Sequence, residues 1–281
     1  MFTLSMTLNK MVNPDIPTSL KVLIRSSFGL MFFSPIIIKE GLSVLRSKNT
    51  KLQLIRIILM SMAMGGTYFT YSNLPFTIAT SIGFTSPIFT AVLSYFILKD
   101  RLAFGQWVAI IVGYAGVLLI TNPQGGITSA IYVAIFSNII TGLGVILTKQ
   151  LTAIDSRNTI VILGNVGVVC ITSIWSLVYW LISLNLQGLG PIVWALPNWN
   201  DLALLMGMGF LGAFSQMSYI TALSYASPSF LSPFEYSRLI IVVPISLAFG
   251  EAFPQQQEII GIIVIISTTL YMTWKGSRRE Q

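Results

Sequence analysis

Residues 75–98, PFTIATSIGFTSPIFTAVLSYFIL, contain no Asp, Glu, Lys, Arg or His. An α-helix rises about 1.5 Å per residue, so a stretch of this length can cross the hydrocarbon core of a bilayer, which is about 30 Å thick. A helix buried in lipid must be apolar on every side, and this stretch has that character. It therefore predicts a membrane-spanning helix, and the rest of the chain follows the same pattern.

Nine apolar stretches divide the chain and predict nine spans. They are residues 19–38, 53–72, 75–98, 102–121, 127–148, 160–184, 202–223, 227–249 and 257–274. Residues 2–12 are also apolar but too short to cross a bilayer, and we expect them to be the second half of a tenth span. The predicted fold class is an all-α integral membrane protein, a ten-helix bundle whose first helix is truncated.

The composition excludes several classes of protein. Of the 281 residues, 54% are hydrophobic and only 9% are charged, whereas a soluble domain has about 25% charged residues. The chain has no His and a single Cys, which excludes an internal disulfide and a His-based zinc or catalytic site. We expect that the protein is not an enzyme, that it has no catalytic residue, and that it binds no cofactor or metal.

The cations indicate the orientation in the membrane. We assume that the chain has ten spans and that its N-terminus lies in the cytoplasm. The loops and chain ends on the cytoplasmic side then carry twelve of the 16 Lys and Arg residues. These are Lys39, Arg46, Lys48, Lys51, Arg56, Lys99, Arg101, Lys149, Arg157, Lys275, Arg278 and Arg279. Cytoplasmic loops are enriched in Lys and Arg, so the asymmetry predicts a multi-pass membrane protein with a cytoplasmic C-terminus. No basic run is interleaved with aromatic residues, so we expect no nucleic acid partner.

The chain repeats itself weakly. Residues 225–251, YASPSFLSPFEYSRLIIVVPISLAFGE, match residues 74–100 in hydropathy, and Ser86 aligns with Ser237 and Asp100 with Glu251. Five spans per half is an odd number, so the two halves would be inverted relative to each other, as in many secondary transporters. We predict a first repeat over residues 1–123, a second over 124–275, and a cytoplasmic tail at 276–281.

Three motifs resemble the EamA-type transporters of the drug/metabolite transporter superfamily. They are Arg25 with the apolar run after it, Ser86-Pro87 through Leu98-Lys99-Asp100-Arg101-Leu102, and Ser232-Pro233-Phe234-Glu235-Tyr236-Ser237-Arg238-Leu239 leading to Phe249-Gly250-Glu251. The last is most similar to the subgroup that includes the rickettsial S-adenosylmethionine uptake transporter. The resemblance implies a transporter of the bacterial inner membrane with a central cavity, and S-adenosylmethionine as the substrate. Amino acids, riboflavin and other metabolites are alternatives.

Ionisable residues inside spans are the first candidates for substrate contact, because burying a charge in lipid is costly. Glu235 and Arg238 are three apart and share one helical face. They could meet an amine and a carboxylate of the substrate, or form an internal ion pair that lowers the cost of insertion. Arg25 could touch substrate, or extend its charged end to the outer interface.

Counting the truncated helix as the first of ten spans, the third span is 53–72 and the eighth is 202–223. Aromatic and amide side chains in or next to these two spans could line a pocket through stacking and hydrogen bonds. Together with the ionisable residues and the motif tyrosine they give the predicted substrate-binding set. The set is Arg25, Tyr68, Tyr71, Asn73, Gln216, Tyr219, Glu235, Tyr236 and Arg238. Prolines at 87, 233 and 244 are expected to interrupt the fourth and ninth spans.

The functional hypothesis is a secondary active transporter that moves a small polar metabolite by alternating access. The expected partners are this metabolite and the lipid bilayer, and a homodimer is left open. An intramembrane lipid-modifying enzyme or a channel are the alternatives from other classes. The first would need clustered acids or His, and the second would need rings of charge or repeated filter sequences. Neither pattern is found in the sequence.

Overall fold

The computed structural model describes residues 2–13, 15–74, 79, 82–100, 104–121, 129–185, 196–237 and 256–277. These residues are helical with short turns and contain no strand, which confirms the all-α prediction. Within them, four helices are long and apolar enough to cross a membrane, or five if one bent pair counts as a span. Three further apolar helices, Ser86–Leu98, Phe104–Gly116 and Ile259–Thr268, are shorter.

The chain forms two compact units, and each combines two segments that are far apart in the sequence. One comprises Met1–Tyr68 and Gln150–Ser224, and the other comprises Phe69–Lys149 and Tyr225–Gln281. The boundaries differ from the predicted repeats at 1–123 and 124–275, because helices from both repeats pack within each unit. The division into two inverted repeats remains a prediction.

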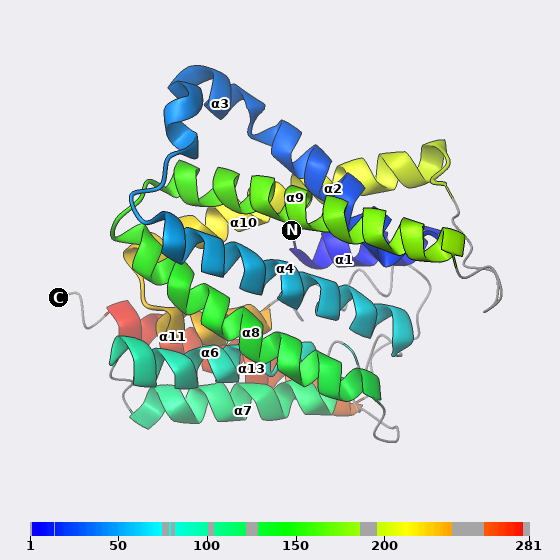
Figure 1. Ribbon diagram of the computed structural model, residues 1–281. Helices are drawn as coiled ribbons and strands as arrows, with labels where there is room; N and C mark the ends of the chain where they lie inside the picture. The colour runs from blue at the N-terminus through cyan, green and yellow to red at the C-terminus, as the bar shows by residue number, and fades with distance from the viewer. Residues whose placement is uncertain are drawn as a thin grey trace. The chain divides into compact units, whose positions relative to one another are not determined.

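The first unit contains most of the long helices (Figure 1). Its elements are α1 (Phe2–Met11), α2 (Thr18–Phe32), α3 (Ser34–Glu40), the 3₁₀ turn η1 (Gly41–Leu45), α4 (Thr50–Asn73) as far as Tyr68, α9 (Arg157–Asn185) and α10 (Trp199–Tyr225). Helix α9 packs along α2 and runs in the opposite direction. Its core includes Phe33, Leu151, Ile160, Ala213 and Ile220, which come from both of its sequence segments.

The predicted span over residues 19–38 is not one straight helix, which corrects the sequence analysis. Helix α2 meets the segment formed by α3 and η1, Ser34–Leu45, at an angle of 46° around Phe33. Pro35 lies in the first turn of α3, where its missing N–H needs no partner, but in a continuous helix its ring would clash with the carbonyl one turn earlier. The break therefore begins a new helix directly before Pro35.

Arg56 does not lie among the surface cations, although the orientation analysis grouped it with them. It is only 2% exposed in α4, and its Nη1 donates to the Ile160 carbonyl at 3.1 Å. The loop that precedes α4 is held by Asp155, which accepts hydrogen bonds from the Ser47 hydroxyl and, at 2.8 Å, from the Lys48 backbone N–H. Buried polar contacts thus hold this end of the unit together.

The second unit contains shorter and more interrupted elements. They are α6 (Ser86–Leu93), the π-helical turn η2 (Ser94–Leu98), α7 (Phe104–Thr121), α8 (Ser129–Thr152), α11 (Pro228–Leu231), the 3₁₀ turn η3 (Ser232–Ser237) and α13 (Gln256–Ser277). Helices α7 and α13 pack closely, since a side chain at Gly116 would lie 3.0 Å from the Gly261 carbonyl oxygen. Such small residues let membrane helices approach one another.

The predicted span over residues 75–98 is broken at the place where a proline was expected to interrupt it. The chain turns at Phe84 and Thr85, and α6 starts at Ser86 with Pro87 in its first turn. Asn138 of α8 stabilises the turn by donating to the Ile82 carbonyl at 2.6 Å and to the Thr85 hydroxyl at 2.9 Å. The corresponding break near Pro233 is a change from α11 to η3, and Pro244 lies outside the described residues.

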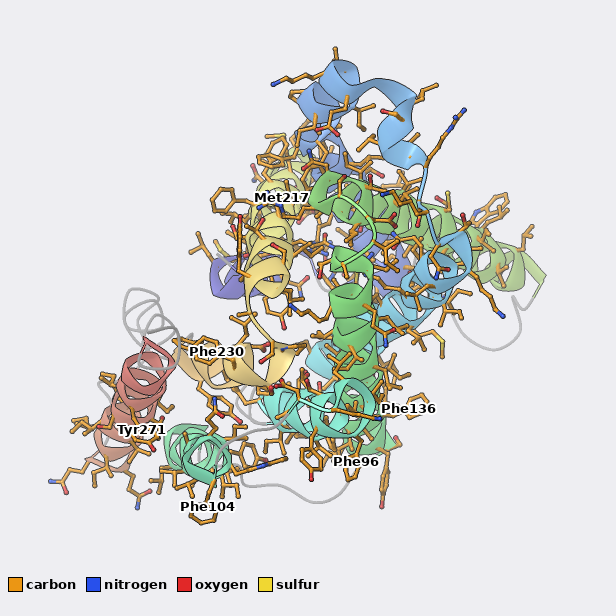
Figure 2. All side chains as sticks on the ribbon, turned by 90° about the vertical axis from the view of Figure 1, so that its left-hand side faces the viewer. Phe96, Phe104, Phe136, Met217, Phe230 and Tyr271 are labelled. Carbon is orange, nitrogen blue, oxygen red and sulfur yellow. The ribbon has the colours of Figure 1, made fainter. Side chains whose placement is uncertain are left out.

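Large apolar side chains point away from the second unit into its surroundings. Figure 2 shows Phe96, Phe104 and Phe136 projecting outward from η2, α7 and α8. They are 71%, 85% and 58% exposed. A soluble protein rarely leaves so many aromatic rings in contact with water, so these faces fit contact with lipid.

Candidate functional site

A cluster of polar side chains lies inside the first unit, where α2, α9 and α10 meet. Asn165 of α9 is nearly buried, and its Nδ2 donates to the Gln216 Oε1 of α10 at 2.9 Å. The same nitrogen donates to the Val161 carbonyl at 2.9 Å. Because Gln216 accepts through Oε1, its Nε2 faces away from Asn165 with two N–H donors, and no described residue accepts from them.

Arg25 brings a positive charge to this cluster from α2. Its guanidinium lies over Gly212 of α10, where an added methyl group would overlap Nη2 and lie 3.2 Å from Cζ. Gly212 is one turn before Gln216, so the two residues share a face of α10. Gly29 follows Arg25 by one turn, and a Cβ added there would lie 3.6 Å from Asn165 Oδ1. The three helices thus present Arg25, Asn165 and Gln216 to one region.

The charge of Arg25 is poorly compensated by the described residues. Its Nη1 lies 3.9 Å from the thioether sulfur of Met64, which is a weak acceptor. Its Nε is buried and has no hydrogen-bond partner among the described residues. A guanidinium that extended to the membrane interface would have its nitrogens in water, so the buried Nε argues against that interpretation.

Two tyrosines lie close to these residues along their own helices. Tyr68 follows Met64 by one turn of α4, is 3% exposed, and has a buried hydroxyl with no partner among the described residues. Tyr219 follows Gln216 on α10 and is half-buried. A buried tyrosine hydroxyl usually finds a partner. The polar region of the first unit therefore contains four of the predicted residues: Arg25, Tyr68, Gln216 and Tyr219.

The remaining predicted residues belong to the second unit. Asn73 is exposed at the end of α4, and its side-chain amide donates to the Phe69 carbonyl of the same helix at 2.8 Å. Tyr71 is half-buried, with its hydroxyl 3.8 Å from the Cβ position of Gly83. Asn73 therefore completes a helix end, and its substrate contact remains a prediction, as does that of Tyr71.

Tyr236 and Glu235 occupy the 3₁₀ turn η3. Tyr236 is fully buried against Phe84 and Ile265 and against the surface of Gly113, where a methyl group would lie 2.7 Å from the ring. This packing gives Tyr236 a structural role in the core of the second unit. Glu235 is half-buried, and Arg238 lies outside the described residues, so their pairing stays a prediction.

The sequence analysis did not select Asn165 or Met64. Asn165 lies within the predicted span at 160–184, and an amide inside an apolar span was a signal that could have found it. Met64 carries no such signal, since methionine is an ordinary apolar residue in a membrane helix. Among the described residues, no three His, Cys, Asp or Glu side chains gather closely enough to hold a metal ion.

The chain is similar to known transporters along most of its length. The S-adenosylmethionine uptake transporter of Rickettsia prowazekii (strain Madrid E) is 22% identical over 255 residues, which cover 90% of this chain and 82% of the relative. The riboflavin transporter of Rhizobium johnstonii (strain DSM 114642 / LMG 32736 / 3841) is 26% identical over 256 residues, covering 90% and 80%.

A solved crystal structure shares the fold with a TM-score of 0.78 and 14% sequence identity, and the match covers 100% of this chain and 95% of that one. Residues 1–122 match the EamA-like transporter family. The relatives are named as transporters, which supports the transporter class over the enzyme class. The resemblance drawn from the three motifs is thus confirmed: the first 122 residues match the EamA-like transporter family, and relatives that align with 90% of the chain are named as transporters.

Proposed function

We propose that this protein is a secondary transporter that moves a small polar metabolite across the bacterial inner membrane by alternating access. The observation that carries the proposal is the polar cluster of Arg25, Asn165 and Gln216 inside a unit built from apolar helices. Polar and charged groups are costly in a membrane interior, and they usually mark substrate pathways. The two predicted repeats would rock against each other around the substrate.

S-adenosylmethionine is the proposed substrate. Relatives from four Rickettsia species carry the name S-adenosylmethionine uptake transporter at 21–22% identity. The compound combines an amino acid end with a cationic sulfonium and an aromatic base, which suits arginine, amide and tyrosine side chains. Riboflavin is the second candidate, because two relatives named riboflavin transporter are each 26% identical.

The experiment that tests the proposal is uptake into proteoliposomes made with the purified protein. Vesicles preloaded with unlabelled S-adenosylmethionine should accumulate the labelled compound with saturable kinetics, and riboflavin should be tested in parallel. Flux that rises linearly with voltage would indicate a channel, and chemical alteration of the label would indicate an enzyme. Absence of accumulation of both compounds would refute both substrate assignments.

Glu235 is the proposed proton-coupling group, because it is a carboxylate within a predicted span. If it binds the coupling proton, Glu235→Gln should abolish uptake driven by a pH gradient but leave exchange of internal and external substrate intact. Equal loss of both activities would contradict this role and would indicate that Glu235 contacts substrate or supports the fold.

The proposed orientation places the C-terminus in the cytoplasm, on the side that carries most of the Lys and Arg residues. A reporter fused after Gln281 should be active if it functions in the cytoplasm, and a reporter that functions only outside the inner membrane should be inactive. The reverse pattern would show that the chain is inserted the other way.

A further inference from the structure

The most informative feature outside the sequence motifs is the set of donors left without acceptors in the first unit. Arg25 offers only N–H groups, and Gln216 presents its Nε2 with the Oε1 already occupied. Among the described residues, Arg25 Nε has no partner and Nη1 meets only a thioether sulfur. A region that holds a positive charge and unpaired N–H donors, with no carboxylate among the described residues paired to that charge, is suited to an anionic group.

We propose that Arg25 and Gln216 bind the carboxylate of the transported metabolite, with Asn165 as the residue that positions Gln216. The inference rests on the proposed transport function and adds the chemical class of the substrate, a metabolite with a free carboxylate. It differs from the pairing expected from the sequence, in which Arg238 would meet the carboxylate.

The depth of these residues fits a site away from both membrane surfaces. Arg25 is seven residues from the start of α2, Asn165 is eight residues from the start of α9, and Gln216 is nine residues from the end of α10. At about 1.5 Å per residue, each lies about 10 Å or more inside its helix. A carboxylate that reaches this depth loses its water, and a guanidinium replaces those hydrogen bonds better than a neutral group does.

Gly212 makes this arrangement possible. Because it has no side chain, the guanidinium can lie directly on α10, one turn from Gln216. A methyl group at this position would push Nη2 away without changing any charge. By contrast, a methyl group at Gly207 on the same helix would meet only the Leu8 side chain, at an ordinary 3.6 Å. Gly207→Ala is therefore a matched control for Gly212→Ala.

Asn165 acts through Gln216 rather than on the substrate. Its Nδ2 is committed to Val161 and Gln216, so it fixes which end of the Gln216 amide faces the region beside Gly212. Asn165→Ala should let the amide rotate and should raise the KM for a carboxylate substrate about 3- to 10-fold while kcat stays within 2-fold. Thr172→Val, on the same helix, removes only the hydroxyl's hydrogen bonds to carbonyls of its own helix and is the control.

The first test uses acetate as a minimal carboxylate and needs no transport. The unfolding temperature of the purified protein in detergent should rise when acetate replaces chloride at equal ionic strength. The rise should persist in Gly207→Ala, shrink in Gly212→Ala and Arg25→Lys, and vanish in Arg25→Gln. No rise in the unchanged protein, or the same rise in every variant, would overturn the proposal. Gly212→Ala retains the charge and so keeps the test valid if Arg25→Gln does not fold.

The second test compares S-adenosylmethionine with its decarboxylated analogue in proteoliposomes. The unchanged protein should have the lower KM for the carboxylate form, and Arg25→Gln should reduce this preference about 10-fold or more. An Arg25-dependent acetate effect without uptake of S-adenosylmethionine would leave the carboxylate site standing and refute the substrate assignment. Uptake with a preference that Arg25→Gln leaves unchanged would refute the carboxylate site and leave the transport function standing.

Discussion

The close approach of α2 and α10 can be tested by adding one methyl group to Gly209. A Cβ at this position would lie 2.6 Å from the Arg25 carbonyl oxygen, 2.8 Å from Phe28 Cβ and 2.9 Å from the Gly29 nitrogen, whereas ordinary contacts begin at 3.4 Å. Two of the three atoms belong to the backbone, so they cannot move away as a flexible side chain can. The helices would have to separate by about 0.8 Å, the difference between the first distance and 3.4 Å.

Gly209→Ala should therefore lower the free energy of unfolding relative to Gly207→Ala. Both changes gain the same helix propensity, up to about 1 kcal/mol for Ala over Gly, so comparing the two variants cancels that term. The difference that remains is the cost of overpacking, about 1–3 kcal/mol, and rigid backbone neighbours place it toward the upper end. At Gly207 the added methyl meets one Leu8 side-chain atom at 3.6 Å and needs no adjustment.

The measurement is reversible unfolding in mixed micelles of mild detergent and sodium dodecyl sulfate, followed by helical circular dichroism. The expected result is a lower midpoint for Gly209→Ala than for Gly207→Ala, with equal slopes of the transition. Equal midpoints for the two variants would refute the inferred contact between α2 and α10. A lower slope in one variant would indicate that the change altered the denatured state or the two-state behaviour rather than the packing.

Three further changes test the packing of the two units by the same unfolding assay. Gly113→Ala places a methyl group 2.7 Å from the ring of the fully buried Tyr236 and should lower stability by about 1–3 kcal/mol; no loss would show that the ring can move. Asn138→Ala removes the bond to the Ile82 carbonyl and should cost about 1–3 kcal/mol, whereas an unchanged midpoint would show that the turn holds itself. Asp155→Asn keeps one acceptor oxygen but loses the negative charge. The loss of unfolding free energy should be about 1 kcal/mol larger at low salt than at high salt, because salt screens the charge, and an equal loss would show that the charge does not contribute.

Much of the architecture could be predicted from local properties of the sequence. Hydropathy predicted helices throughout, and the described parts of the predicted spans are helical apart from short breaks such as those at Phe33 and at Phe84 and Thr85. The start of α6 directly before Pro87 was also predictable, because a proline ring affects its own helix wherever the rest of the chain lies. The same rule applied to Pro35 would have predicted the bend between α2 and α3.

The candidate site was predictable only in part. Arg25 and Gln216 stood out because charged and amide side chains are rare inside apolar spans. That Arg25 lies on Gly212 could not be derived, because the two residues are far apart in sequence and a glycine gives no sign of which side chain will lie against it. Tyr236 was selected with its motif, yet its ring fills the core beside Gly113.

The sequence by itself determined the class of fold and the approximate limits of the helices, and it predicts the side of the membrane on which the cations gather. Each of these depends on the free energy of transferring a short segment from water to lipid, and that free energy is a sum over neighbouring residues. Tertiary structure decided which helices share a unit, where Arg56 is buried, and which donors converge near Gly212. In lipid, these depend on close packing and on hydrogen bonds between distant segments, because helices already buried in an apolar solvent gain little from further hydrophobic burial.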